Sequence, residues 1–199
     1  MFIKDIFPIP IGNEYLNDIS DERLLEIKNF CSEQNFHQFT PPISENQFIL
    51  DDPFLKDLKE KILKFTKNYL EKTSKRYDKI EIASSWAVKM VNNGFAIEHS
   101  HSNSLFSGVF YLDEGSPIYF TDPNQNKWWI KGNDPLDDNN PYGWDRVNLK
   151  PSPKLAVIFP SWLFHGVKET PDNSNIRMSI AFNIIPRGLQ GTQGAYINL

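Results

Sequence analysis

Residues 79–90 read KIEIASSWAVKM, and side chains of two kinds alternate along this stretch. The mostly larger, apolar set is Ile80, Ile82, Ser84, Trp86, Val88 and Met90, and the set between them is Glu81, Ala83, Ser85, Ala87 and Lys89. A period of two is that of a β-strand, because successive side chains of a strand project to opposite faces. This stretch therefore predicts a long, half-buried strand, and it marks the point where the chain changes from helix to sheet.

Downstream of this strand the sequence continues as sheet. Further strands are expected at residues 95–101, 107–112, 117–120, 146–149, 155–159, 163–168 and 176–185, separated by clusters of Asn, Gly, Pro and Asp. About eight strands behind two helices favour a mainly β fold, a double-stranded β-helix or jelly-roll barrel with helices packed on one side.

Upstream of it the sequence predicts one edge strand and two packing helices. The edge strand is expected at residues 2–10, where prolines are tolerated because they need not donate to a ladder. The first helix is expected at residues 21–33 behind Ser20 as N-cap, and the second runs to about Lys72 behind Asp52 as cap, with Pro53 at its first position. Both helices carry an apolar stripe at helical spacing.

The chain of 199 residues fits one domain. Residues 1–78 would hold the N-terminal strand and helices, and residues 79–187 the barrel core. Residues 121–145 form a polar, Trp-containing insertion that is long for a connector in a compact domain. It would be either a substrate lid or a surface insertion whose Trp128, Trp129 and Trp144 fill a small core of their own.

Composition excludes several classes of protein. A net charge of -4 gives no basic field for a phosphate backbone, so general nucleic-acid binding is not expected. Cys31, the only cysteine, lies in the first expected helix, which predicts a core residue with neither an internal disulfide nor a Cys-rich metal cluster. No stretch is apolar enough to cross a bilayer, and we expect a cytoplasmic protein.

Three of the four histidines fall on expected strands. His99 and His101 stand two residues apart, so both would point into the barrel, and a later strand could bring His165 opposite them. Three imidazoles in that arrangement form a facial metal site, which suits Fe, Zn, Cu or Ni. The alternative is a pair of surface or hydrogen-bonded histidines.

A buried cation is expected behind this site. The segment NIRMSIAFN places Arg177, Ser179 and Asn183 on one strand face, and an unpaired guanidinium is costly to bury. A carboxylate of a bound ligand would pair with Arg177 through two parallel hydrogen bonds, with Ser179 as a further donor; the distal carboxylate of 2-oxoglutarate fits this description. The alternative is an ion pair with an Asp or Glu of the chain.

A third strand adds two candidate contacts to that ligand. In SGVFYL, Ser107 and Tyr111 share a face, and the phenol of Tyr111 could reach the same carboxylate. Otherwise Tyr111 is a core aromatic with its hydroxyl at the rim.

The two stretches GFAIEHSHSNSLFSGVFYL, residues 94–112, and LAVIFPSWLFHGVKETPDNSNIRMSIAFN, residues 155–183, resemble the 2-oxoglutarate/Fe(II)-dependent oxygenase superfamily. More narrowly, they are similar to an uncharacterised branch found in marine bacteria and their tailed phages, with the patterns HxHxxxxxSGVYYL and FPSWLxHxVxxxxxxxRxSxxFN. The resemblance covers about the C-terminal half of the chain, and its specificity lies in the combination of pieces.

The resemblance implies roles for the candidate residues. His99 would be the first Fe(II) ligand and His165 the distal one, while Arg177 and Ser179 would anchor 2-oxoglutarate with help from Tyr111. The wider family has a carboxylate at the middle ligand, where this sequence has His101, unless the register shifts so that His101 and Asn103 take the two places. A neutral ligand leaves the metal site one charge unit more positive.

The resemblance also implies a reaction: a dioxygenase that converts O2 and 2-oxoglutarate to succinate and CO2 while it hydroxylates a C–H bond. A protein side chain is the first guess for the substrate, by analogy only. A homodimer is left open, as is a host cytoplasmic location for a phage-encoded chain. The alternatives are a cupin-like metalloprotein that does not use 2-oxoglutarate, and a non-catalytic jelly-roll binding module.

Overall fold

A computed structural model describes residues 5, 7–73, 77, 79–124, 145–170 and 176–199 of the chain. Its helical elements all precede the long strands: α1 Asp21–Ser32, the 3-10 turns η1 Ile49–Asp51 and η2 Pro53–Leu55, and α2 Lys56–Lys72. Both expected caps are confirmed. The Ser20 side chain accepts a hydrogen bond from the Arg23 amide, and the Asp52 side chain accepts one from the Phe54 amide, with Pro53 opening the turn that leads into α2.

The strands form two main antiparallel sheets. The large sheet has the order β1-β9-β6-β11-β4-β3-β2. Its strands are β1 Gly12–Tyr15, β2 Phe36–His37, β3 Ile43–Ser44, β4 Lys79–Met90, β6 Phe106–Tyr111, β9 Leu155–Pro160 and β11 Arg177–Arg187. The small sheet has the order β5-β10-β7-β8, with β5 Ala96–His99, β7 Ile118–Thr121, β8 Arg146–Leu149 and β10 His165–Val167.

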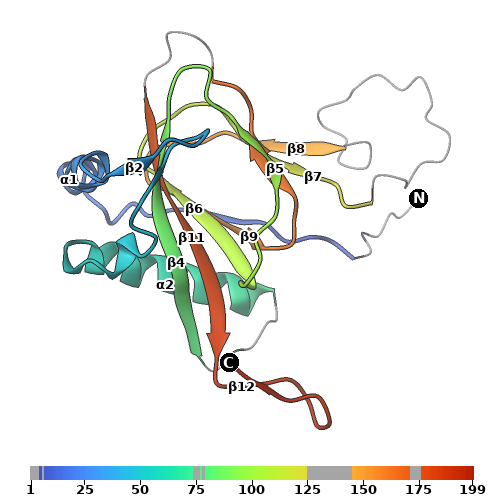
Figure 1. The fold of residues 1–199 in the computed structure, drawn as a ribbon. Helices are drawn as coiled ribbons and strands as arrows, with labels where there is room; N and C mark the ends of the chain where they lie inside the picture. The colour runs from blue at the N-terminus through green and yellow to red at the C-terminus, as the bar shows by residue number, and fades with distance from the viewer. Residues whose placement is uncertain (1–4, 6, 74–76, 78, 125–144, 171–175) are drawn as a thin grey trace, which may run out of the picture.

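The large sheet is covered on both faces. On one face, Met178, Ile180 and Phe182 of β11 pack with residues of α1 and α2 in the larger apolar core. On the other face, Tyr111 and Val157 pack with Phe120 of the small sheet in a second core. In Figure 1, α1 lies on the opposite side of the large sheet from β7 and β8. Two facing antiparallel sheets with helices on one outer face form the jelly roll that the sequence predicts.

The strand β4 contains a bulge that the simple alternation of residues 79–90 does not predict. Asn183 and Ile184 are consecutive in β11, but their partners in β4 are Ser84 and Ile82, so Ala83 is the extra residue. Ile82 therefore packs with the helices, whereas Ser84 shares a face with Asn183. The expectation of a single apolar face from Ile80 to Met90 is wrong for this reason.

The remaining differences between the predicted and the observed elements lie at the ends of the chain segments and in short strands. The first strand is β1, and residues 5 and 7–11 are not strand, since Pro8 and Pro10 have no amide to donate. The short strands β2 and β3 carry too few residues for a period to show. The expected insertion at 121–145, with its three tryptophans, lies for residues 125–144 outside the described part of the chain.

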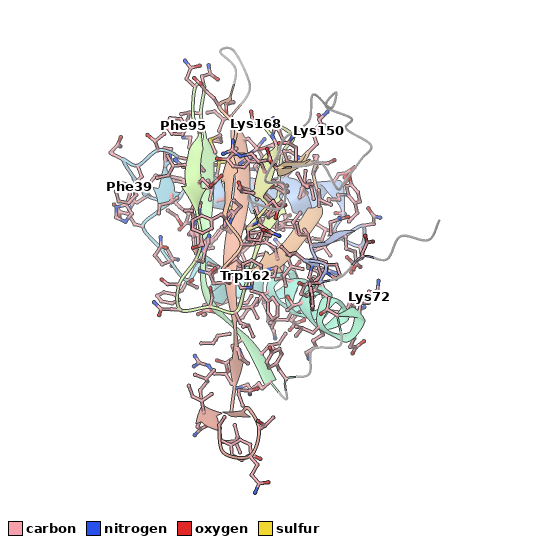
Figure 2. The ribbon with its side chains drawn as sticks, turned by 90° about the vertical axis from the view of Figure 1, so that its right-hand side faces the viewer. Phe39, Lys72, Phe95, Lys150, Trp162 and Lys168 are labelled. Carbon is pink, nitrogen blue, oxygen red and sulfur yellow. The ribbon has the colours of Figure 1, made fainter. Side chains whose placement is uncertain are left out.

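A two-stranded hairpin, β12 Leu189–Gln190 with β13 Ile197–Asn198, ends the chain. In both views it extends away from the rest of the molecule (Figures 1 and 2). Cys31 is fully buried in α1, as expected. No helix in the described part of the chain is long and apolar enough to span a bilayer.

Gly108 is a point where the sheet admits no side chain. A Cβ at this position would lie 2.4 Å from the Val157 carbonyl oxygen and 2.3 Å from the Phe182 ring. We expect Gly108→Ala to lower the free energy of unfolding by about 1–3 kcal/mol, because the central strands must move apart to accept the methyl group. Urea unfolding followed by circular dichroism measures this loss, and an unchanged midpoint would contradict the close packing of β6 on β9 and β11.

Candidate metal centre

The three predicted histidines meet between the two sheets. His99 at the end of β5 pairs directly with His165 at the start of β10, as the sequence suggests a late strand would allow. The ring centroids of His99 and His165 lie 4.5 Å apart, and the His101 ring lies 5.1 Å from each of them. One ligand atom of each ring lies within 4.8 Å of the others. The predicted convergence of the three imidazoles is confirmed.

Two of the rings are oriented by backbone carbonyl groups two residues earlier in the chain. The Nδ1 atom of His99 lies 2.7 Å from the Ile97 oxygen, and that of His165 lies 2.9 Å from the Leu163 oxygen. A carbonyl only accepts, so Nδ1 carries the proton in both rings. The lone pair of each neutral ring is therefore on Nε2, where a metal ion can bind it.

His101 reaches the same point from outside the strand. The sequence predicts a strand through His101, but β5 ends at His99. The backbone amide of His101 instead donates to the Ser161 oxygen at 2.9 Å, which ties this loop to the segment between β9 and β10. The Trp86 ring stacks on the His101 ring at a centroid distance of 5.8 Å.

Two of the three rings are suited to a metal ion because burial keeps them neutral near pH 7. Burial lowers the pKa of His165 to about 3, against the hydrogen bond to Leu163. Burial and the neighbouring His99 lower the pKa of His101 to about 4. Three imidazoles that converge on one point match the donor set of a site for Fe, Zn, Cu or Ni.

Arg177 lies at the start of β11 on the barrel-facing side and is only 3% exposed. Its Nη1 donates to the Ser116 oxygen at 2.8 Å, and its buried Nε has no hydrogen-bond partner in the described part of the chain. Among the described residues no acid lies within ion-pair distance of it. The oxygens of nearby Asp113 accept hydrogen bonds from Lys28 and from the Met178 amide instead. A buried, incompletely satisfied guanidinium is what a site for a ligand carboxylate requires.

Ser179 and Tyr111 lie beside Arg177. They are partners in the register of β11 and β6, and both are buried. The Arg177 guanidinium carbon lies 5.4 Å from the centroid of the Tyr111 ring. Burial raises the pKa of Tyr111 to about 12, against the field of Arg177, so its phenol stays protonated and able to donate.

Ser107 lies elsewhere. It pairs with Asn183, which is six positions along β11 from Arg177, or roughly 20 Å at the rise of a strand. Its hydroxyl bonds to Asn183 Oδ1 and to Ser161 Oγ, both at 2.8 Å. The structure thus brings together Arg177, Ser179 and Tyr111, and places Ser107 near the histidines instead.

The sequence assigns no function to three residues near the histidines. Trp86 stacks on His101, and Ser161 accepts the backbone amide of His101. The third residue, Asn183, bonds to Ser107, which in turn bonds to Ser161. The signal for Asn183 is its place on the same strand face as Arg177. No comparable signal marks Trp86, whose side of the sheet depends on the bulge at Ala83.

The part of the chain that carries these residues matches a known family. Residues 84–183 match the family described as "Putative 2OG-Fe(II) oxygenase", just over half of the chain. These residues include all three histidines and Arg177. No curated protein matches the chain by sequence.

Several solved structures share the fold. The non-heme alpha-ketoglutarate-dependent carbocyclase SnoK from nogalamycin biosynthesis superposes with a TM-score of 0.66 at 11% identity, over 90% of this chain and 81% of that one. A prolyl-4-hydroxylase from Pseudomonas putida gives 0.59 at 11% identity, over 90% and 94%. HygX from Streptomyces hygroscopicus, with nickel and 2-oxoglutarate bound, gives 0.61 at 8% identity, over 89% and 83%.

Sequence identities this low show only that the fold is shared. The assignment to a family rests on the match of residues 84–183. Fe(II) and 2-oxoglutarate, expected from the sequence, are the cofactors of the matched family. The chain belongs to the 2OG-Fe(II) oxygenases.

Proposed function

We propose that the protein is an Fe(II)- and 2-oxoglutarate-dependent dioxygenase that hydroxylates a C–H bond of its substrate. The observation that carries this proposal is the buried Arg177, whose Nε has no hydrogen-bond partner among the described residues. Arg177 faces the same interior as the three converging imidazoles. A metal site alone does not require such a cation. A dicarboxylate bound between the metal and the guanidinium uses both.

In this proposal one group of residues binds the metal and another binds 2-oxoglutarate. His99, His101 and His165 would hold Fe(II) through one nitrogen each, and Arg177 would bind the distal carboxylate of 2-oxoglutarate with hydrogen bonds from Ser179 and Tyr111. When bound, Fe(II) and 2-oxoglutarate supply the chemistry that activates O2. The protein supplies position and a dry pocket, since Phe120 and Phe159 pack against the His165 ring.

The overall reaction balances with one substrate. One oxygen atom of O2 enters the substrate as a hydroxyl and the other enters succinate, while 2-oxoglutarate loses CO2. A protein side chain as substrate, the marine bacterial and phage branch, and a cytoplasmic location remain predictions from the sequence.

A second candidate is a metal-dependent enzyme that does not use 2-oxoglutarate. The absence of a carboxylate from the candidate ligand group of the described residues favours it, because the wider family pattern has one. The two candidates differ in what they bind. The first binds 2-oxoglutarate through Arg177, whereas the second binds a metal ion without a ligand carboxylate at Arg177.

Thermal unfolding under anoxic conditions separates these candidates. We expect Mn(II), as an inert substitute for Fe(II), to raise the Tm, and N-oxalylglycine to raise it further only when Mn(II) is present. A ligand at 100 times its Kd adds about 2.7 kcal/mol, or roughly 5–10 °C for a chain of this size. Glutarate, which lacks the oxo group, is the matched control ligand.

The outcomes point in different directions. A Tm that rises with Mn(II) but not further with N-oxalylglycine would favour the second candidate. A Tm that changes with neither Mn(II) nor N-oxalylglycine would refute both candidates. Succinate formation from 2-oxoglutarate with Fe(II) and O2 would then establish the reaction itself.

A further inference from the structure

The connection between β6 and β7 closes over Arg177. The Ser116 oxygen accepts a hydrogen bond from Arg177 Nη1 at 2.8 Å. A Cβ atom at Gly115 would lie 2.8 Å from the Arg177 Cδ and 3.3 Å from its Cβ and Cγ. Gly115 is exposed whereas Arg177 is 3% exposed, so this connection lies between the Arg177 side chain and solvent. We call residues 113–116 the Arg177 loop.

The Arg177 loop is bonded to the strand that carries Arg177. The ladder between β6 and β11 runs only as far as the pair Tyr111 and Ser179. Beyond that pair, the Leu112 amide donates to the Met178 oxygen at 3.1 Å, and the Met178 amide donates to Asp113 Oδ2 at 2.9 Å. A side-chain carboxylate thus holds the loop to the backbone directly after Arg177.

Asp113 is engaged through both of its oxygens. Its Oδ1 accepts a hydrogen bond from Lys28 Nζ of α1 at 2.6 Å, while its Oδ2 accepts the Met178 amide. No ion pair among the described residues joins Asp113 to Arg177. Asp113 therefore anchors the loop and leaves the guanidinium available to a ligand carboxylate.

We propose that Asp113 is the positioning residue of the 2-oxoglutarate site: it holds the Arg177 loop on β11, and the loop holds the guanidinium in place for the ligand. The proposal rests on the function proposed above, in which Arg177 binds the distal carboxylate. A guanidinium pairs with a carboxylate through two parallel hydrogen bonds only in the right orientation. Fixing that orientation before the ligand arrives reduces the loss of side-chain entropy on binding.

Asp113→Ala removes the acceptor of the Met178 amide and frees the loop. We expect the Kd of 2-oxoglutarate, measured by calorimetric titration with Mn(II) present, to rise roughly 10–100-fold, as for the loss of one charge-assisted hydrogen bond. The Kd of Mn(II) alone should stay as in the native protein, because the three histidines keep their contacts. A role in stability alone would not separate the two constants.

Asp113→Asn tests which bond of the carboxylate matters. Its amide keeps one oxygen for two donors, Lys28 Nζ and the Met178 amide. Met178 is 1% exposed, whereas the Lys28 side chain is 37% exposed and can be hydrated. The oxygen should therefore accept the Met178 amide, which is the more costly group to leave unpaired. We expect this variant to restore most of the 2-oxoglutarate affinity.

Gly115→Ala disturbs the loop at its other end without touching Asp113. The added methyl group must displace the Arg177 side chain, so 2-oxoglutarate binding should weaken while Mn(II) binding stays unchanged. Asp52→Ala is the matched control, because the Asp52 carboxylate also accepts a backbone amide, that of Phe54 at 2.8 Å, but in the helical layer. It should lower the Tm and leave the Kd of 2-oxoglutarate unchanged.

The outcomes distinguish this inference from the proposed function. If the native protein and Arg177→Met bind 2-oxoglutarate equally well, or neither binds it, the proposed function is refuted. If Arg177→Met loses binding while a folded Asp113→Ala or Gly115→Ala protein keeps the native Kd, only the positioning role is refuted. An Asn variant as weak as the Ala variant would also overturn the role of the Met178 bond.

Discussion

Replacing Arg177 by methionine is expected to abolish the response to 2-oxoglutarate and at the same time to make the ligand-free protein at least as stable as it was. The guanidinium is buried with no acid within ion-pair distance in the described part of the chain, and its Nε has no partner. Leaving a buried ligand carboxylate without its cation costs about 3–5 kcal/mol, or roughly a few hundred- to a few thousand-fold in Kd.

The gain in stability has the same origin. An unpaired buried charge is a cost to the folded state, and methionine fills much of the same space without a charge. Its stem can keep the contact that the Arg177 side chain makes around Gly115, where a Cβ would lie 2.8 Å from the Arg177 Cδ. The single hydrogen bond to Ser116 is lost, which offsets only part of the gain. Calorimetric titration with 2-oxoglutarate and the Tm without ligand measure the two effects.

Arg187→Met is the matched control, because Arg187 ends the same strand at a half-exposed position with Glu81 2.8 Å away. Its loss should change neither 2-oxoglutarate binding nor, beyond about 1 kcal/mol, stability. An Arg177→Met protein that is clearly less stable, yet binds 2-oxoglutarate normally, would show that Arg177 is a structural residue.

The sequence predicts the candidate site well where a local pattern fixes the direction of a side chain. Arg177 faces the interior because Met178, Ile180 and Phe182 occupy the other face of the same strand. His99 meets His165 because both lie on strands that become partners. For Arg177 a period of two, read from consecutive residues, is enough, whereas the meeting of His99 and His165 also requires their two strands to pair.

The sequence does not predict features that depend on pairing between distant segments. The face on which Ser84 lies is set by a bulge that exists only relative to β11, and the alternation within residues 79–90 contains no sign of it. The partners of Ser107 come from β11 and from the loop after β9, so a reading of SGVFYL alone groups Ser107 with Tyr111 and Arg177. The carbonyls that orient His99 and His165 are local in sequence, but bonding to them depends on the rotamer of each ring.

Removing His165 is expected to have the largest effect on metal binding. His165 is the most buried of the three histidines, and its lone pair is directed by the Leu163 carbonyl. His165→Ala leaves two imidazoles, and we expect Co(II) affinity to fall by more than the roughly 100-fold that marks the upper end for groups that only hydrogen-bond to a ligand. Because the metal and Arg177 would hold 2-oxoglutarate together, the Tm response to N-oxalylglycine with Mn(II) should disappear as well.

The fourth histidine provides the control for this loss. His37 is exposed in β2, with its ring tilted against that of Phe39, and is not one of the three converging histidines, so His37→Ala should leave Co(II) binding unchanged. His165→Ala also leaves a cavity beside Phe159, whose ring lies 4.5 Å from the imidazole, so a loss of stability is expected in its own right. His99→Ala, at a less buried position, separates the two effects: it should lose metal while it stays folded. If His99→Ala remained folded and bound Co(II) like the native protein, the three imidazoles would not act as one ligand set.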